Sequence, residues 1–170
     1  MKLLGMVFIV SSAAYGGIAM AQDLRRRCRI LRQITSALEL MRSELSYCGT
    51  PLPKVFALMA AASEGVVAAM FSSVAKCMDK FRWITPDACM RRVMSEQTVI
   101  SRIPGIPDTL LQLCATLGSY DLDHQLRGID LAASRINQMI VEVDQELKGK
   151  CRMYRTIGVC AGLALAILLV

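Results

Sequence analysis

Apolar residues recur every three or four positions through most of the chain, which is the spacing of one face of an α-helix. The first such stripe consists of Leu24, Cys28, Leu31, Ile34, Leu38, Met41, Leu45 and Cys48. Nowhere does a run of β-branched residues alternate with polar ones, as it would in a half-buried strand. The pattern therefore predicts an all-α protein.

Helix stop and start signals divide this pattern into six helices. Gly49 is a C-terminal stop, Thr50 an N-cap and Pro51 a first-turn proline, and Thr85 with Pro86 repeats the start signal. The predicted helices cover about 24–48, 51–62, 66–81, 86–100, 108–117 and 121–151. Because short corners join them, we expect an antiparallel six-helix bundle.

Both ends of the chain are uncharged and lie next to basic residues. Residues 3–21 precede one cluster and residues 157–170 follow another; the basic residues are Arg25, Arg26, Arg27, Arg29, Arg32, Lys148, Lys150, Arg152 and Arg155. The first stretch is just long enough at ~1.5 Å per residue to cross a hydrocarbon core of ~30 Å, and the second is shorter. Basic residues stay on the cytoplasmic side. The sequence thus predicts transmembrane anchors at 1–22 and 156–170 that flank a cytoplasmic six-helix bundle at 23–155.

A cleaved secretory signal peptide is the alternative for the first apolar stretch. The sequence AMAQ at 19–22 offers a cleavage site, and Lys2 supplies a short basic start. The chain would then be an exported domain anchored only at its C-terminus. The arginines that follow the stretch favour an uncleaved anchor, because their translocation is unfavourable.

The net charge of +6 is concentrated beside the two ends. Nine of the 20 basic residues flank them, which leaves 11 basic against 14 acidic residues elsewhere. A nucleic-acid-binding domain would instead have a basic face of its own. We therefore expect no nucleic-acid partner, and we expect the nine flanking residues to contact anionic membrane lipids.

The sequence lacks the motifs of the common enzyme and metal sites. No P-loop, dinucleotide-binding or zinc-protease motif occurs, the seven cysteines are irregularly spaced, and there is one histidine. We expect no enzyme activity, metal, cofactor or small-molecule substrate. The alternative is a small membrane enzyme or sensor that uses His124 and the acids at Asp121 and Asp123, although a catalytic histidine needs a nucleophile within reach.

Three stretches taken together, LRQITSALELMRSELSYCGTPLP (31–53), LGSYDLDHQLRGIDLA (117–132) and YRTIGVCAGLALAILLV (154–170), resemble the stage III sporulation protein AB family. That family is similar in turn to the F domain of the type II secretion inner-membrane platform, a six-helix cytoplasmic bundle. The resemblance implies a structural platform subunit of a secretion-like channel between mother cell and forespore, required for endospore formation. It also implies a mother-cell membrane location with both ends anchored, and partners that are other channel subunits and a secretion-type ATPase.

Two of these stretches meet at one end of the predicted bundle, because the corners at 48–51 and 118–121 both lie at the end far from the anchors. Corner chemistry accounts for the glycines and the first proline. Asp121 can act as a cap, whereas Glu44 and Gln125 have no evident local role. We therefore hypothesise an acidic docking patch for a cytoplasmic partner, and its members are Glu44, Gly49, Thr50, Pro51, Pro53, Gly118, Asp121 and Gln125.

Overall fold

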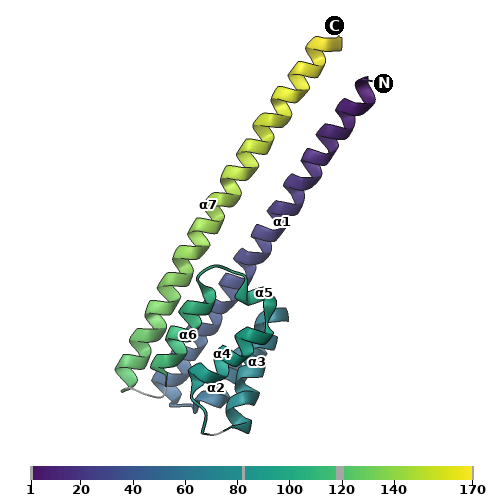
Figure 1. The fold of residues 1–170 in the computed structure, drawn as a ribbon. Coiled ribbons are helices and arrows are strands. Elements are labelled where there is room, and N and C mark those ends of the chain that lie inside the picture. The colour runs from purple at the N-terminus through teal and green to yellow at the C-terminus, as the bar shows by residue number, and fades with distance from the viewer. Residues whose placement is uncertain (1, 82, 118–120, 170) are drawn as a thin grey trace. The chain divides into compact units, whose positions relative to one another are not determined.

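The computed structural model describes the backbone of residues 2–81, 83–117 and 121–169 and the side chains of 22–81, 83–97, 99–117 and 121–149. Every regular element in these ranges is helical (Figure 1), which confirms the predicted all-α class. The elements are α1 (Lys2–Ser43), the single π-helical turn η1 (Glu44–Cys48), α2 (Leu52–Ala62), α3 (Gly65–Lys80), α4 (Pro86–Glu96), α5 (Thr98–Ser101), α6 (Ile106–Thr116) and α7 (Leu122–Leu169).

The chain forms two compact units. One consists of Met1–Arg29 together with Val141–Val170, and the other is Ile30–Ile140. We call the second the core unit, because it contains every corner between helices. The helices α1 and α7 each contribute residues to both units.

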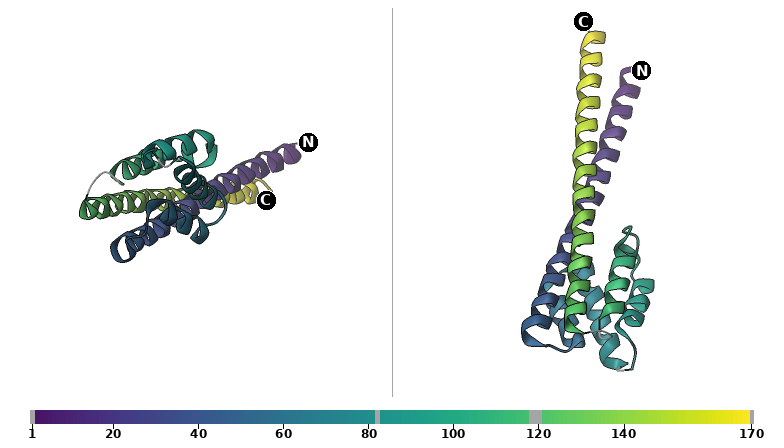
Figure 2. Two further views of the ribbon diagram at one scale, coloured as in Figure 1. Left: turned by 90° about the horizontal axis from the view of Figure 1, so that it is seen from below. Right: turned by 90° about the vertical axis from the view of Figure 1, so that its left-hand side faces the viewer.

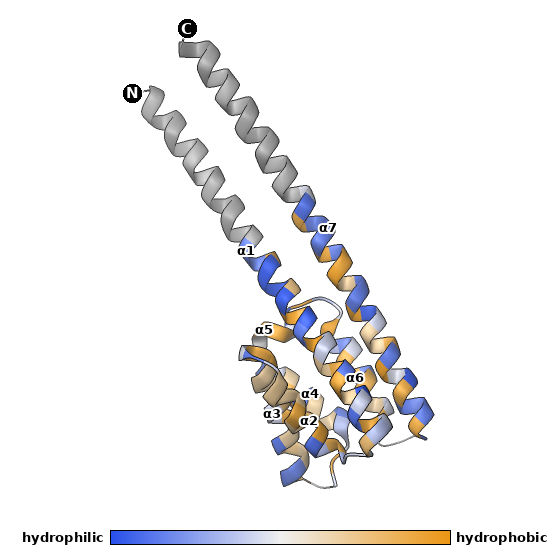
Figure 3. Ribbon diagram, turned by 180° about the vertical axis from the view of Figure 1, so that it is seen from behind, coloured by the Kyte–Doolittle hydropathy of each residue, from blue (hydrophilic) through white to orange (hydrophobic). Residues whose placement is uncertain are grey.

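The core unit buries the apolar stripe of α1 that the sequence predicts. Leu31, Ile34, Leu38 and Met41 are all fully buried, because their spacing places them on one face of the helix. The opposite face of this helix is polar, and Figure 3 shows hydrophobic and hydrophilic residues alternating in the same way along the described part of α7. Burial of each such side chain contributes about 1.5–3 kcal/mol to folding.

The helices α2 and α3 pack against each other and supply the aromatic part of the core. The rings of Phe56 and Phe71 are both buried, with centroids 6.2 Å apart. Tilted aromatic pairs of this kind add about 0.5–1.5 kcal/mol beyond their buried area. The helix α4 then contacts both α3 and α6, so the core continues through the second half of the unit.

The end of the first helix differs from the prediction. Leu45 is buried as expected, but Cys48 is exposed, and Tyr47 between them is 86% exposed. The cause is the π-helical turn η1, in which hydrogen bonds span five residues instead of four. The wider turn changes the phase of the stripe, so the three-residue step from Leu45 no longer reaches the buried face.

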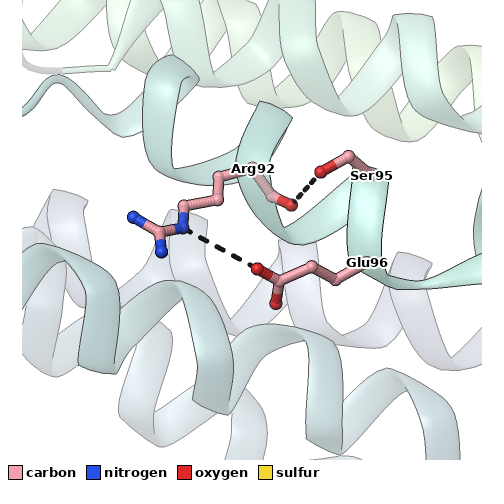
Figure 4. Close-up of polar contacts among 3 residues, drawn as sticks. All are labelled: Arg92, Ser95 and Glu96. Carbon is pink, nitrogen blue, oxygen red and sulfur yellow. Dashed lines mark hydrogen bonds and ion pairs between the residues drawn. The ribbon is translucent and has the colours of Figure 1, made fainter.

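The predicted fourth helix, 86–100, is divided in the structure, so the six-helix description is corrected. The helix α4 ends at Glu96, Gln97 has an extended backbone, and the short α5 follows. Figure 4 shows the hydroxyl of Ser95 donating to the carbonyl of Arg92 (2.7 Å), a bond that competes with helix continuation. The ion pair between Arg92 and Glu96 (3.7 Å) in the same view is exposed and contributes little.

The break after α4 has a packing consequence. After the break, Ile100 in α5 and Ile103 in the turn that follows are both buried. The following turn ends at Gly105, whose φ of 81° is in the left-handed region that favours glycine. The helix α6 therefore begins at Ile106, two residues earlier than the sequence predicts.

The helices α6 and α7 approach each other closely at Gly128. A Cβ atom at this position would lie 2.6 Å from the Thr116 hydroxyl oxygen, which is closer than atoms tolerate. Arg135 of α7 also donates a hydrogen bond to the side-chain oxygen of Gln112 on α6. The helix α1 is linked to α7 by the Arg42–Asp130 ion pair (2.8 Å), which is half exposed and so contributes no more than about 1 kcal/mol.

The predicted location of the chain is corrected by the structure. Among the residues whose side chains are described, no helix combines the length and the apolar character needed to cross a membrane. This finding contradicts the predicted mother-cell membrane location with both ends anchored, and that prediction is withdrawn. The apolar stretches on which it depended, 3–21 and 157–170, lie outside the residues whose side chains are described.

The close contact between α6 and α7 predicts how substitutions at two glycines of α7 differ. Gly128→Ala gains about 1 kcal/mol in helix propensity but overpacks against Thr116, which costs about 1–3 kcal/mol. We expect a net loss of stability in chemical denaturation. Gly149→Ala is the matched control, because its Cβ meets nothing within 4 Å, and we expect it to be neutral or stabilising.

The added substitution Thr116→Ala identifies the cause of that loss. It removes the hydroxyl that the new methyl group would meet, so Gly128→Ala should cost less in the Thr116→Ala background than in the wild type. Equal stability of the Gly128→Ala and Gly149→Ala proteins would contradict the close approach of the two helices.

Candidate docking end of the core unit

Three corners lie at the same end of the core unit, as Figures 1 and 2 show. They are the corner between η1 and α2, the corner between α3 and α4, and the start of α7 at Asp121. We call this end the corner end. The turn at 102–105 lies toward the opposite end. The sequence-predicted docking residues Glu44, Gly49, Thr50, Pro51 and Pro53 are at the first corner, whereas Gly118 lies outside the described residues.

Two side chains and a left-handed glycine close the first corner. The Thr50 hydroxyl donates to the Glu44 carboxylate at 2.7 Å. Gly49 has a φ of 57°, and its backbone N–H donates to the Glu44 carbonyl, to which the Thr50 N–H also donates at 3.3 Å. Glu44 therefore accepts hydrogen bonds at both its carbonyl and its carboxylate. We call the Glu44–Thr50 pair the corner clasp.

The corner clasp corrects two expectations. Thr50 is not the N-cap of α2, because Pro51 occupies that position and its carbonyl accepts from Lys54 N–H (2.9 Å) and Val55 N–H (3.1 Å). Glu44, which the sequence leaves without a local role, helps to close the turn. The signal that could have revealed this role is the left-handed glycine, since a Schellman-like reversal folds the next residue back over the last helical turn.

An open groove of about 790 Å³ adjoins the same corner, and sequence reasoning did not find it. It lies between the start of α2, the end of α3 and the start of α4, and its apolar lining includes Pro51, Pro53, Ala57, Ala75, Met78 and Ile84. Lys54, Lys76 and Asp79 are the charged residues of the lining. Two predicted docking residues, Pro51 and Pro53, thus belong to a concave surface.

The start of α7 presents acidic residues at the corner end. The carbonyl of Asp121 accepts from the N–H groups of His124 (3.0 Å) and Gln125 (3.1 Å), so Asp121 occupies the cap position. Asp121 and Asp123 are exposed on either side of Leu122, which is 43% exposed, and Gln125 is half-buried. Acids in the first turn interact favourably with the helix dipole, so these two residues also stabilise the helix start.

The nine basic residues beside the ends are only partly described. Arg25, Arg26, Arg29 and Arg32 are exposed, whereas Lys150, Arg152 and Arg155 lie outside the described side chains. Two others already have acidic neighbours one turn away. Arg27 pairs with Asp23 at 2.9 Å and Lys148 with Asp144 at 2.6 Å. These two pairs lower the positive charge available to an anionic surface.

The cysteines of the core unit differ strongly in environment. Cys48 is exposed, whereas Cys89 and Cys114 are buried. Burial, reinforced by the neighbouring Cys77 thiol, raises the pKa of Cys89 to about 12, and burial also raises the pKa of Cys114. The described part of the chain contains no group of three or more His, Cys, Asp or Glu side chains that could hold a metal ion.

The model of the family described as stage III sporulation protein AB matches residues 2–170. The chain belongs to this family. Stage III sporulation protein AB of Bacillus subtilis (strain 168) is 29% identical over 169 residues, which are 99% of each chain. A solved structure of stage III sporulation protein AB superposes with a TM-score of 0.65 over 72% of this chain and 97% of the solved one, at 23% identity, which shows the shared fold. The family resemblance in the sequence is therefore confirmed, and the chain is a stage III sporulation protein.

The corner clasp predicts a coupled loss of stability. Thr50→Val keeps the shape of the side chain but removes the donor to Glu44, and we expect a loss of about 1 kcal/mol in chemical denaturation. Glu44→Ala should cost a similar amount, and the double variant less than the sum. Glu39→Ala is the control, because Glu39 is exposed on α1. Strict additivity of the two changes would show that the pair does not interact.

The buried thiols predict selective alkylation and a pH effect. At pH 8 we expect iodoacetamide to modify Cys48 readily and to spare Cys89 and Cys114 until the protein unfolds, because only thiolates react. The raised pKa of Cys89 means that unfolding releases a proton between pH 9.0 and about 12. Stability should therefore fall as pH rises through this range, and less steeply in Cys89→Ala. Rapid labelling of native Cys89 would contradict its burial.

Proposed function

We propose that this protein is a structural subunit of a secretion-like channel between mother cell and forespore, in which the core unit docks other subunits. The observation that most supports the proposal is the family match over residues 2–170, which includes every helix of the core unit. Requirement for endospore formation is part of the proposal. So is the absence of catalysis, which rests on the missing motifs in the sequence.

We propose the corner end as the docking surface and a secretion-type ATPase as the partner. At the start of α7, the exposed apolar side chain of Leu122 lies between two exposed carboxylates in the chain, those of Asp121 and Asp123. This arrangement suits a partner surface with basic residues around an apolar depression. Glu44 contributes less to the proposed docking than the sequence suggests, because its carboxylate already accepts a hydrogen bond from Thr50. The docking set is therefore centred on the start of α7.

Anionic lipid headgroups are a second proposed class of contact, through the exposed arginines between Arg25 and Arg32. Each basic residue near an anionic surface contributes about 1 kcal/mol to the free energy of membrane binding, and salt weakens this interaction. Cosedimentation of the full chain with anionic and with neutral vesicles, at low and high salt, tests this. We expect a larger salt-sensitive fraction with the anionic vesicles, and equal binding to both kinds would refute it.

The charges at the start of α7 predict the outcome of a sporulation assay. Asn caps helices as well as Asp does, so Asp121→Asn combined with Asp123→Asn removes two charges at a cost within about 1 kcal/mol of helix-dipole energy. We expect fewer heat-resistant spores and reduced recovery of the ATPase in affinity purification, with little change in melting temperature. Glu39→Gln is the matched control, because Glu39 is an exposed acid on α1.

Two outcomes would contradict this proposal in different ways. Normal spore counts and normal ATPase recovery from the double variant would place the docking surface elsewhere. A large fall in melting temperature would instead show that Asp121 and Asp123 act through the fold and not through docking, and the loss of spores would then follow from unfolding.

A further inference from the structure

The groove at the first corner has walls with helical periodicity. Pro53 and Ala57 are four residues apart on α2, and Ala75 and Met78 are three apart on α3. Residues with these spacings share one face of a helix. Ala57 and Ala75 are small, so the two walls leave between them the open volume of about 790 Å³.

An exposed tryptophan is the chain neighbour of one of the groove residues. Trp83 is 82% exposed and directly precedes Ile84, which lines the groove. Its ring is edge-on to Phe81, with centroids 6.2 Å apart. A large aromatic side chain held in the open by an aromatic neighbour is typical of binding hot spots, which are enriched in tryptophan.

The charged residues of the groove favour an acidic partner. Lys54 and Lys76 are both exposed, and neither forms an ion pair with any residue that the structure describes. Asp79 is the single acid of the lining. Lys80 and Arg92 lie over the Phe81 ring at 5.3 Å and 5.9 Å, so further positive charge lies beside the aromatic neighbour of Trp83.

We propose that this groove binds an amphipathic helical segment of a partner protein, with acidic residues beside its apolar face. The ridges of α2 and α3 match the i, i+3, i+4, i+7 anchors of a docked helix. The groove is open along one side, whereas small-molecule sites bury most of their ligand. The two lysines bind the acids of the segment, and Trp83 covers its apolar face. This surface is separate from the acidic start of α7, so the inference does not depend on the docking of the ATPase.

The test measures binding of two fluorescent helical peptides to the purified full chain by anisotropy. Both peptides have leucines at i, i+4 and i+7 spacing, one with glutamates and the other with lysines at the flanking positions. We expect the glutamate peptide to bind about tenfold more tightly, because it can form two exposed ion pairs with the lysines that the lysine peptide cannot form. Lys54→Glu combined with Lys76→Glu should abolish or reverse that preference.

A second variant blocks the groove without changing its charge. Ala57→Trp fills the space between the walls from an exposed position and should reduce binding of the glutamate peptide at least about tenfold. Ala115→Trp, an exposed alanine on α6, and Arg102→Glu, an exposed charge reversal at the opposite end, are the controls and should leave binding unchanged. Melting temperatures of all variants show whether each one is folded.

Three results would overturn the proposal. The first is equal binding of the two peptides, and the second is unchanged binding to folded Ala57→Trp. The third is a wild-type dimer in sedimentation that becomes a monomer in Ala57→Trp, which would show that a second copy of the chain occupies the groove.

Discussion

The chain reversal between Glu44 and Thr50 is the constraint on which the corner end depends. The π-helical turn widens the last turn of the first helix, and Gly49 in the left-handed region turns the chain back. The corner clasp then joins the two sides at 2.7 Å. Because Pro51 caps α2 directly after this reversal, the reversal sets where α2 begins and therefore where one wall of the groove lies.

Buried apolar side chains stabilise both halves of the core unit. In the first half, fully buried side chains of α1, α2 and α3, with the Phe56–Phe71 pair among them, supply most of the favourable energy. In the second half, buried residues such as Met90 and Leu110 continue the core, and a close helix contact at Gly128 brings α7 against α6. Exposed ion pairs such as Arg42–Asp130 add little. The core therefore leaves the residues of the corner end, such as Tyr47, Trp83 and Asp123, available to partners.

Most of the fold is predictable from the sequence, because buried helix faces impose a regular spacing. The stripe from Leu31 to Leu45 is buried as its intervals indicate, and the family resemblance is confirmed by the family match. The exposure of Cys48, the role of Thr50 and the break after Glu96 are not predictable in this way. The first two depend on the π-helical turn and the chain reversal that follows it, and the third accompanies a hydrogen bond from the Ser95 side chain to the backbone. Apolar periodicity reports none of these features.

The candidate site is also only partly predictable from the sequence. Corner signals in the sequence place Gly49, Pro51 and Asp121 at helix ends, but they do not reveal that two alanines on neighbouring helices open a groove beside Pro53. Such a volume arises from small residues that face each other across two helices, and spacing within one helix says nothing about it. The predicted membrane location is a case in which a sequence pattern misled. It was inferred from the apolar ends of the chain, and the described residues contradict it.

The claim that partners dock at the corner end can be tested most directly by site-specific photo-crosslinking in sporulating cells. A photoreactive phenylalanine replaces Tyr47, which is 86% exposed at the corner end, or Arg102, which is exposed in the turn toward the opposite end. We expect position 47 to crosslink to the secretion-type ATPase or another channel subunit and position 102 not to do so. Crosslinks of equal yield from both positions, or from position 102 alone, would contradict it.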